Sequence, residues 1–159
     1  MIEAFITHWV YGGVLAGVML LVLFPLLVRG WPRPQALTLL LLPVYMLHQG
    51  EEHVLDRFRI FFNQTLGGGQ ELLSPLAVFV INVPGVWGVI VASACLAAKV
   101  DVGLGMIAGY LVLINGIAHI GHGLLFGSYN PGLISAIAVF VPLGAYVIRC
   151  IHLECQRKL

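Results

Sequence analysis

The residues best suited to chemistry lie in two short segments of the chain. The first reads His48-Gln49-Gly50-Glu51-Glu52-His53, within an otherwise apolar stretch. Each residue turns an α-helix by about 100°, so His48, Glu51 and Glu52 share one helix face, whereas His53 falls off that face. Burying two adjacent carboxylates among apolar residues is costly. We therefore expect this face to point into a protein interior and to find partners there.

The second segment reads Asn115-Gly116-Ile117-Ala118-His119-Ile120-Gly121-His122. Asn115, His119 and His122 are spaced by four and then three residues, which places them on one stripe of a helix. Glycines beside the stripe leave room for a partner helix or a ligand: Gly116, Gly121 and Gly123.

Two carboxylates and two or three imidazoles form a plausible set of metal ligands. Helical bundles that bind two irons use glutamates and Glu-x-x-His pairs, and the spacings His48-x-x-Glu51 and His119-x-x-His122 are compatible with that pattern without matching it. A single iron or zinc ion with two histidines and one carboxylate would also suit the set. The predicted ligands are His48, Glu51, Glu52, His119 and His122, with Asn115 expected to orient a histidine or a water.

The same residues also support chemistry that needs no metal. Two adjacent carboxylates repel each other when both are ionised, so one should hold its proton and act as an acid beside a base. An isomerase or cyclase acting on a lipid-soluble substrate would need little more. In both schemes the predicted catalytic groups are Glu51, Glu52, Asn115 and Tyr129, because Tyr129 lies in the turn that borders the cluster.

Three other functions stay open at this point. Glutamates and histidines inside a membrane also build proton relays, as in proton-coupled transporters, although the chain shows no inverted repeat. A haem-binding protein could use His48 or His119 as an axial ligand. An accessory subunit is the third, and no residue pattern favours it. The cysteines, Cys95, Cys150 and Cys155, have no metal or redox spacing.

The composition indicates that these segments lie in membrane helices. Of the 159 residues, 60% are hydrophobic and 9% are charged, whereas about a quarter of a soluble domain is charged. A spanning helix needs about 20 mostly apolar residues. The sequence predicts an all-α polytopic membrane bundle of about five transmembrane helices in one domain, residues 1–159, with spans at about 9–28, 36–56, 72–98, 103–125 and 132–152. The small-residue pairs Gly13/Gly17 and Gly105/Gly109 favour close helix crossings within the bundle.

The two polar stripes should meet, because the second and fourth spans cross the membrane in the same direction. His48 and Asn115 each lie about 12 residues into their helices, or roughly 18 Å at about 1.5 Å per residue. Glu51 and Glu52 then match His119 in depth, and the inner half of the bundle is nearly all aliphatic. Membership of His8 and His53 in the site stays open, and His152 is expected outside it.

Basic residues predict the orientation of the chain in a bacterial cytoplasmic membrane. Cytoplasmic loops carry an excess of lysine and arginine. With an odd number of spans and the N-terminus outside, the inner side holds Arg29, Arg33, Lys99, Arg149, Arg157 and Lys158, and the outer side holds Arg57 and Arg59. We therefore expect the N-terminus outside, the C-terminus in the cytoplasm and the polar cluster in the outer half of the membrane. The expected partners are the lipid bilayer and a lipidic or apolar small molecule, and nothing indicates nucleic acid.

The motifs resemble those of the HXXEE-domain family of bacterial integral membrane proteins. The family takes its name from the pattern seen here at His48, Glu51 and Glu52. Two later patterns are also similar: Asn115-x-x-x-His119, and His122-x6-Tyr129-x-Pro131-Gly132, followed by Ser135 where a threonine is common. The similarity extends over roughly residues 8–150. It implies a membrane protein and points to an enzyme, but it implies no particular reaction.

Overall fold

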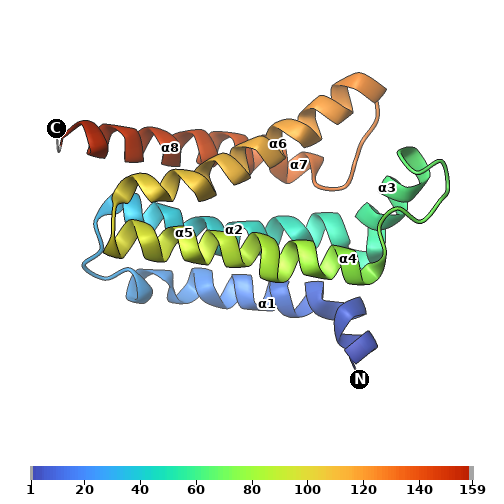
Figure 1. Cartoon of the computed structure of the whole chain (residues 1–159), viewed down its shortest axis with the longest axis horizontal. Helices are drawn as coiled ribbons and strands as arrows, with labels where there is room; N and C mark the ends of the chain where they lie inside the picture. Colours follow the sequence, from blue (N-terminus) through green and yellow to red (C-terminus); the bar gives the residue numbers. More distant parts are fainter. Residues whose placement is uncertain (1, 158–159) are drawn as a thin grey trace.

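The chain forms a bundle of long helices lying side by side (Figure 1). A computed structural model describes residues 2–157, and this part of the chain is helical, with no strand. In chain order the elements are α1 (Ile2–Leu27), α2 (Arg33–His53), η1 (Val54–Asp56), α3 (Arg57–Thr65), α4 (Pro75–Val80), η2 (Ile81–Trp87), α5 (Gly88–Lys99), η3 (Val102–Gly105), α6 (Met106–Phe126), α7 (Leu133–Ser135), η4 (Ala136–Phe140) and α8 (Val141–Gln156). The predicted all-α bundle is confirmed.

Four of the helical rods are long and apolar enough to cross a membrane: Ile6–Leu27, Pro75–Lys99, Val102–Phe126 and Leu133–Gln156. These correspond to the first, third, fourth and fifth predicted spans, and the protein is an integral membrane protein. The second predicted span forms α2, which is 21 residues long but less apolar, because its last turns carry His48, Gln49, Glu51, Glu52 and His53.

Helix α2 lies at the centre of the bundle and contacts α1, α5, α6 and α8. Its first half packs into an aliphatic and aromatic core that includes Leu41, Ile90, Val112 and Phe140, all fully buried. The other helices therefore shield α2, and it carries its polar residues into the bundle interior rather than against lipid.

Glycines permit the closest of these contacts. A Cβ atom at Gly17 would lie 3.0 Å from Cβ of Met46 and 3.2 Å from the carbonyl oxygen of Pro43, where α1 crosses α2. A Cβ atom at Gly109 would lie 2.8 Å from Cγ1 of Ile148 on α8. Both small-residue pairs thus serve packing inside one bundle, as the sequence predicts.

The helical rod Pro75–Lys99, which corresponds to the third predicted span, widens into a π-helical turn at η2. This turn contains Pro84. Polar side chains stabilise this region: Asn82 donates to the carbonyl oxygen of Val78 at 2.8 Å. Gln49 of α2 donates to Asn82 Oδ1 at 2.7 Å and accepts from the indole Nε1 of Trp87 at 2.6 Å. The network satisfies both ends of the Gln49 amide, which is fully buried, and it fixes η2 against the polar half of α2.

A short helix, α3, was not predicted from the sequence. Leu55 and Asp56 both adopt left-handed backbone angles, with φ of 60° and 59°, and they break the chain between α2 and α3. Arg59 holds this turn, because its guanidinium donates to Asp56 at 2.6 Å and to Glu71 at 3.0 Å. The hydrogen bond to Asp56 is the main reason that the pKa of Arg59 is raised. Helix α3 thereby lies at one end of the bundle (Figure 1).

Candidate metal centre

Three buried side chains from α2 and α6 meet at one point. The Glu52 carboxylate lies between two imidazoles: Oε1 is 2.9 Å from His119 Nε2, and Oε2 is 3.4 Å from His48 Nε2. His48, Glu52 and His119 are only 2%, 4% and 6% exposed. The predicted match in depth between the polar stripes of the second and fourth spans is therefore confirmed.

The orientation of His119 is set by the loop that follows α6. Asn130 donates its amide to the His119 carbonyl oxygen at 2.9 Å, which turns its own Oδ1 toward His119 Nδ1 at 2.7 Å. His119 Nδ1 therefore carries a proton and donates it to Asn130. In the neutral imidazole, the lone pair is then on Nε2, and it points at the Glu52 carboxylate.

The orientation of His48 is set in the same way by the helical rod Leu133–Gln156, called the fifth rod here because it corresponds to the fifth predicted span. The Ser135 hydroxyl donates to Glu51 Oε2 at 2.5 Å, so it must accept from His48 Nδ1, which lies 2.7 Å away. His48 Nε2 is then the unprotonated nitrogen, and it accepts from the Asn115 amide at 3.3 Å. Both Nε2 atoms thus lie beside the Glu52 carboxylate, and that of His48 would exchange the Asn115 amide for a metal ion on binding one.

This donor set fits a metal ion. Two imidazole nitrogens that carry no proton in the neutral rings and a carboxylate converge in a buried space, where a metal cation would compensate the buried negative charge. One ligand atom from each of His48, Glu52 and His119 lies within 4.8 Å of the others. Two histidines and one carboxylate suit iron or zinc, and the hydrogen bonds from Nδ1 to Ser135 and Asn130 are the outer partners that metal-bound histidines normally have.

Glu51 is placed elsewhere, at the N-terminus of α7. Its carboxylate accepts from the backbone N–H groups of Ile134 and Ser135 at 3.0 and 2.8 Å, from the Ser135 hydroxyl and from the Tyr129 hydroxyl at 3.0 Å. A carboxylate at this position satisfies N–H groups that have no partner within their own helix and interacts favourably with the helix dipole. Although predicted as a ligand, Glu51 uses its oxygens to bind the fifth rod to α2.

Tyr129, the fourth predicted catalytic group, borders the site without entering the three-residue cluster. It is 50% exposed, and its hydroxyl donates to Glu51. Partial burial, followed by this hydrogen bond, raises the pKa of Tyr129 above its ordinary value. The phenol therefore stays protonated and continues to donate to Glu51 across the physiological pH range.

Gly132 brings the fifth rod into direct contact with the cluster. Its φ is +98°, in the region that favours glycine. A Cβ atom there would lie 2.6 Å from His119 Cε1, 2.9 Å from Glu52 Cγ and 2.9 Å from His48 Cε1. The glycine of the Tyr-x-Pro-Gly pattern therefore forms one wall of the candidate metal centre.

The remaining histidines differ in their distance from the cluster. His53 Nε2 lies 3.5 Å from Glu52 Oε2, so His53 adjoins the cluster although it lies on another helix face. The His122 ring instead packs between Phe61 and Phe126. His8 is exposed beside Tyr11 on α1.

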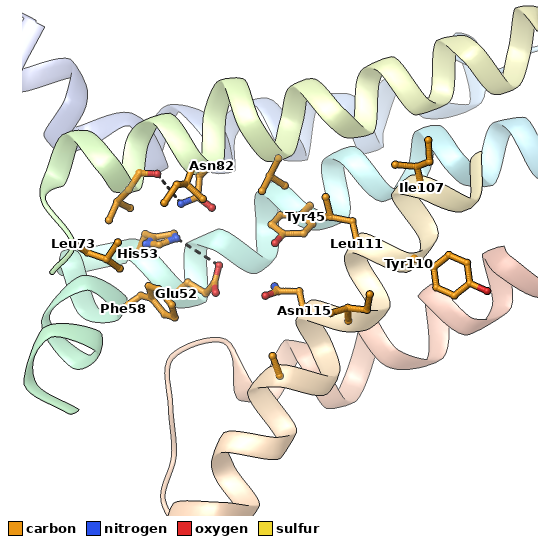
Figure 2. Close-up of a pocket in the computed structure, with 15 residues that line it drawn as sticks. Tyr45, Glu52, His53, Phe58, Leu73, Asn82, Ile107, Tyr110, Leu111 and Asn115 are labelled. Atoms are coloured by element: carbon orange, nitrogen blue, oxygen red, sulfur yellow. Dashed lines mark hydrogen bonds and ion pairs between the residues drawn. The ribbon is translucent and has the colours of Figure 1, made fainter. Parts of the chain in front are cut away.

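A cavity of about 680 Å³ opens beside the cluster, between α4–η2 and α6. Figure 2 shows Glu52, Asn115 and Tyr45 pointing toward one another across it. Apolar side chains form most of the remaining wall, among them Ile81, Val86, Ile107 and Ile114. Ile81, Ile107 and Ile114 are also exposed on the outside of the bundle, so the cavity adjoins the surface that faces lipid.

Two residues that support the site were not assigned from the sequence. Asn130 and Ser135 orient the two histidines, and both belong to the segment around the Tyr-x-Pro-Gly pattern. The signal for Asn130 was a polar residue in that turn. The signal for Ser135 was the hydroxyl at a position where a threonine is common.

Comparison with known proteins places the chain in one family. No curated protein and no solved structure matches it. A family model described as a protein of unknown function with an HXXEE motif matches residues 39–147, which is more than half of the chain and includes the whole candidate metal centre. The protein therefore belongs to the HXXEE family.

Proposed function

We propose that this protein is a membrane-embedded, metal-dependent enzyme that acts on an apolar or lipidic substrate. The observation that carries the proposal is the convergence of His48 Nε2, His119 Nε2 and the Glu52 carboxylate, with both imidazoles oriented so that Nε2 is the nitrogen without a proton in the neutral ring. A purely structural polar core has no need of such an electron-rich point, because buried charges rarely stabilise a fold.

Iron or zinc is the metal that this donor set favours. When bound, it would act as a Lewis acid that polarises an oxygen of the substrate. His48, Glu52 and His119 would hold it, and the Asn115 amide, which lines the neighbouring cavity, would position the substrate. The apolar cavity walls would keep water from the reacting groups and admit a hydrocarbon from the bilayer.

Metal analysis of the purified protein tests this proposal. We expect about one iron or zinc per chain in the wild type, and loss of most of it in His48→Gln, Glu52→Gln and His119→Gln. His152→Gln is a matched control, because His152 lies on the exposed side of α8 and its ring contacts Gln156, far from the cluster in the chain. A folded wild-type protein without metal, or equal metal in the His119 and His152 variants, would refute the assignment.

One distance favours acid–base catalysis without metal as a second candidate. His119 Nε2 and Glu52 Oε1 are 2.9 Å apart, a separation at which they can share a proton directly. In that case Glu52 and His119 would move a proton on the substrate, as in an isomerase or cyclase. Activity that survives complete removal of metal would favour this candidate over the first.

We further propose that the protein lies in the bacterial cytoplasmic membrane with its N-terminus outside. The excess of lysine and arginine on the side of Arg29, Lys99 and Arg149 supports this orientation. The candidate metal centre would then lie in the outer half of the membrane, near α3 and the turn at Tyr129.

A further inference from the structure

A second, smaller cavity lies on the other side of the cluster, between α3 and α6. Its volume is about 190 Å³, less than a third of that of the first cavity. Three phenylalanines of α3 form its outer wall: Phe58, Phe61 and Phe62. The opposite wall carries His119 and His122 of α6.

His122 presents unused hydrogen-bonding groups to this cavity. Both of its ring nitrogens are buried, and neither has a hydrogen-bond partner within residues 2–157. The ring packs against two aromatic side chains, stacked on Phe126 with 4.4 Å between centroids and edge-on to Phe61 at 4.9 Å. A buried polar group without a partner costs free energy, and a polar atom of a ligand in this cavity would remove that cost.

The two cavities adjoin at the candidate metal centre. Phe58, Asn115 and Ala118 line both of them. Glu52 lines the larger cavity, and His119 lines the smaller one. A single molecule that extends from one cavity into the other would therefore pass directly beside the three converging side chains.

The chemistry of the smaller cavity defines the group that it would bind. Aromatic walls favour a planar ring, which can stack or pack edge-on. The polar groups that line it are the imidazoles of His119 and His122 and the amides of Asn115 and Asn130, with no carboxylate among the lining residues. A cationic head group would find no counter-charge there, whereas a hydroxyl or carbonyl oxygen would find hydrogen-bond partners.

We propose that the substrate is an amphiphile whose planar ring, bearing a hydroxyl or carbonyl group, occupies the smaller cavity while its hydrocarbon tail lies in the larger one. His122 binds the oxygen of the ring, and Ala118 lies at the junction that the molecule crosses. This inference rests on the proposed function for its reaction, but the binding that it describes can be measured alone.

Binding of tritiated 4-hexadecylphenol to the purified protein, stripped of metal with a chelator, tests the ring. We expect it to bind more tightly than hexadecan-1-ol, which lacks the ring. His122→Phe keeps the ring volume but removes the nitrogens, and it should weaken phenol binding about five- to tenfold, as expected for one hydrogen bond. His152→Phe, on the exposed side of α8, should leave binding unchanged.

Ala118→Phe tests the connection between the cavities, because the added ring would fill the junction. We expect it to weaken binding of 4-hexadecylphenol more than tenfold. Ala98→Phe is the matched control, since Ala98 is also an exposed helical alanine but lines neither cavity. Equal binding by the Ala118 and Ala98 variants would refute the passage between the cavities.

The outcomes separate this inference from the proposed function. Equal affinity for the phenol and the alcohol, or equal effects of the His122 and His152 variants, would overturn the ring assignment even if metal binds to His48, Glu52 and His119. Phenol binding that depends on His122 in a protein that never binds metal would support the ring assignment and overturn the metal centre alone.

Discussion

The two adjacent glutamates of the HXXEE motif have different surroundings. Successive residues of a helix point about 100° apart, so Glu52 faces His119 of α6 while Glu51 faces the start of α7. Glu52 lies next to imidazole nitrogens of His48, His53 and His119, whereas Glu51 has hydrogen-bond donors for both of its oxygens. We infer that one carboxylate holds the fold together and the other is available for chemistry.

Glutamine substitutions should separate these two roles. Glu51→Gln removes the charge that accepts from the α7 backbone, and it should lower the free energy of unfolding by about 1–3 kcal/mol while metal binding per folded chain persists. Glu52→Gln should abolish metal binding with a much smaller change in melting temperature. Thermal unfolding and metal content, measured on both variants, check this, and the reverse pattern would contradict the division of roles.

The Tyr129–Glu51 hydrogen bond gives a prediction about pH. Because the pKa of Tyr129 is raised above its ordinary value, the stability that this bond contributes is fully present below about pH 10, and it is lost only as pH rises through the raised value. The wild type should therefore melt at a higher temperature than Tyr129→Phe, by an amount that is constant from pH 7 to pH 9. Thermal unfolding of both proteins at the same pH values measures this difference. A difference that vanishes within this interval would show that the bond does not form.

The start of the fifth rod determines the geometry of the site. The loop after α6 supplies Asn130 to His119, Gly132 to the wall and Ser135 to His48 within six residues of sequence. This segment acts as a cover that is bound to α2 through Glu51. Disturbing its backbone should therefore affect the metal centre more than a comparable change elsewhere.

Gly132→Ala tests the cover. The new Cβ would collide with both histidines and Glu52, and we expect loss of metal binding together with a lower melting temperature. Gly127→Ala is the matched control, because Gly127 also has a positive φ, at +60°, but a Cβ there meets nothing within 4 Å. The control should show only the backbone strain, so similar metal loss in both variants would contradict a specific role for Gly132.

The helices and the meeting of their polar stripes could be predicted from the sequence, because both follow from hydrophobic length and from the pitch of an α-helix. The partner of each side chain could not. Helical spacing places Glu51 and Glu52 on the two flanks of the face that carries His48, and only the position of α7 determines that Glu51 binds a helix terminus. Asn130 lies in a turn without periodicity, and the left-handed pair Leu55 and Asp56, which directs α3 across the second cavity, has no signal in hydropathy.

Polarity is concentrated at one end of the bundle. The first half of α2 packs in an aliphatic and aromatic core, whereas its last turns, α3 and the turn at Tyr129 surround the candidate metal centre. A substrate dissolved in the bilayer would therefore approach from the lipid-facing side between α4–η2 and α6, and its polar part would lie toward the end of the bundle where α3 is found (Figure 1). The proposed orientation makes that end the outer one.

Single cysteines test this orientation in a variant whose three native cysteines are replaced by serine. A membrane-impermeant maleimide added to spheroplasts of a bacterial host should label cysteine at Gln70 and Ser128, which are exposed in the loops at the end of the bundle that holds the site. Cysteine at Val100 and Gln156, exposed at the opposite end, should react only after the membrane is permeabilised. The physical reason is the excess of basic residues at that opposite end, which favours retention in the cytoplasm. The reverse labelling pattern would place the candidate metal centre in the cytoplasmic half of the membrane, and its substrate would then have to be supplied from the inner leaflet.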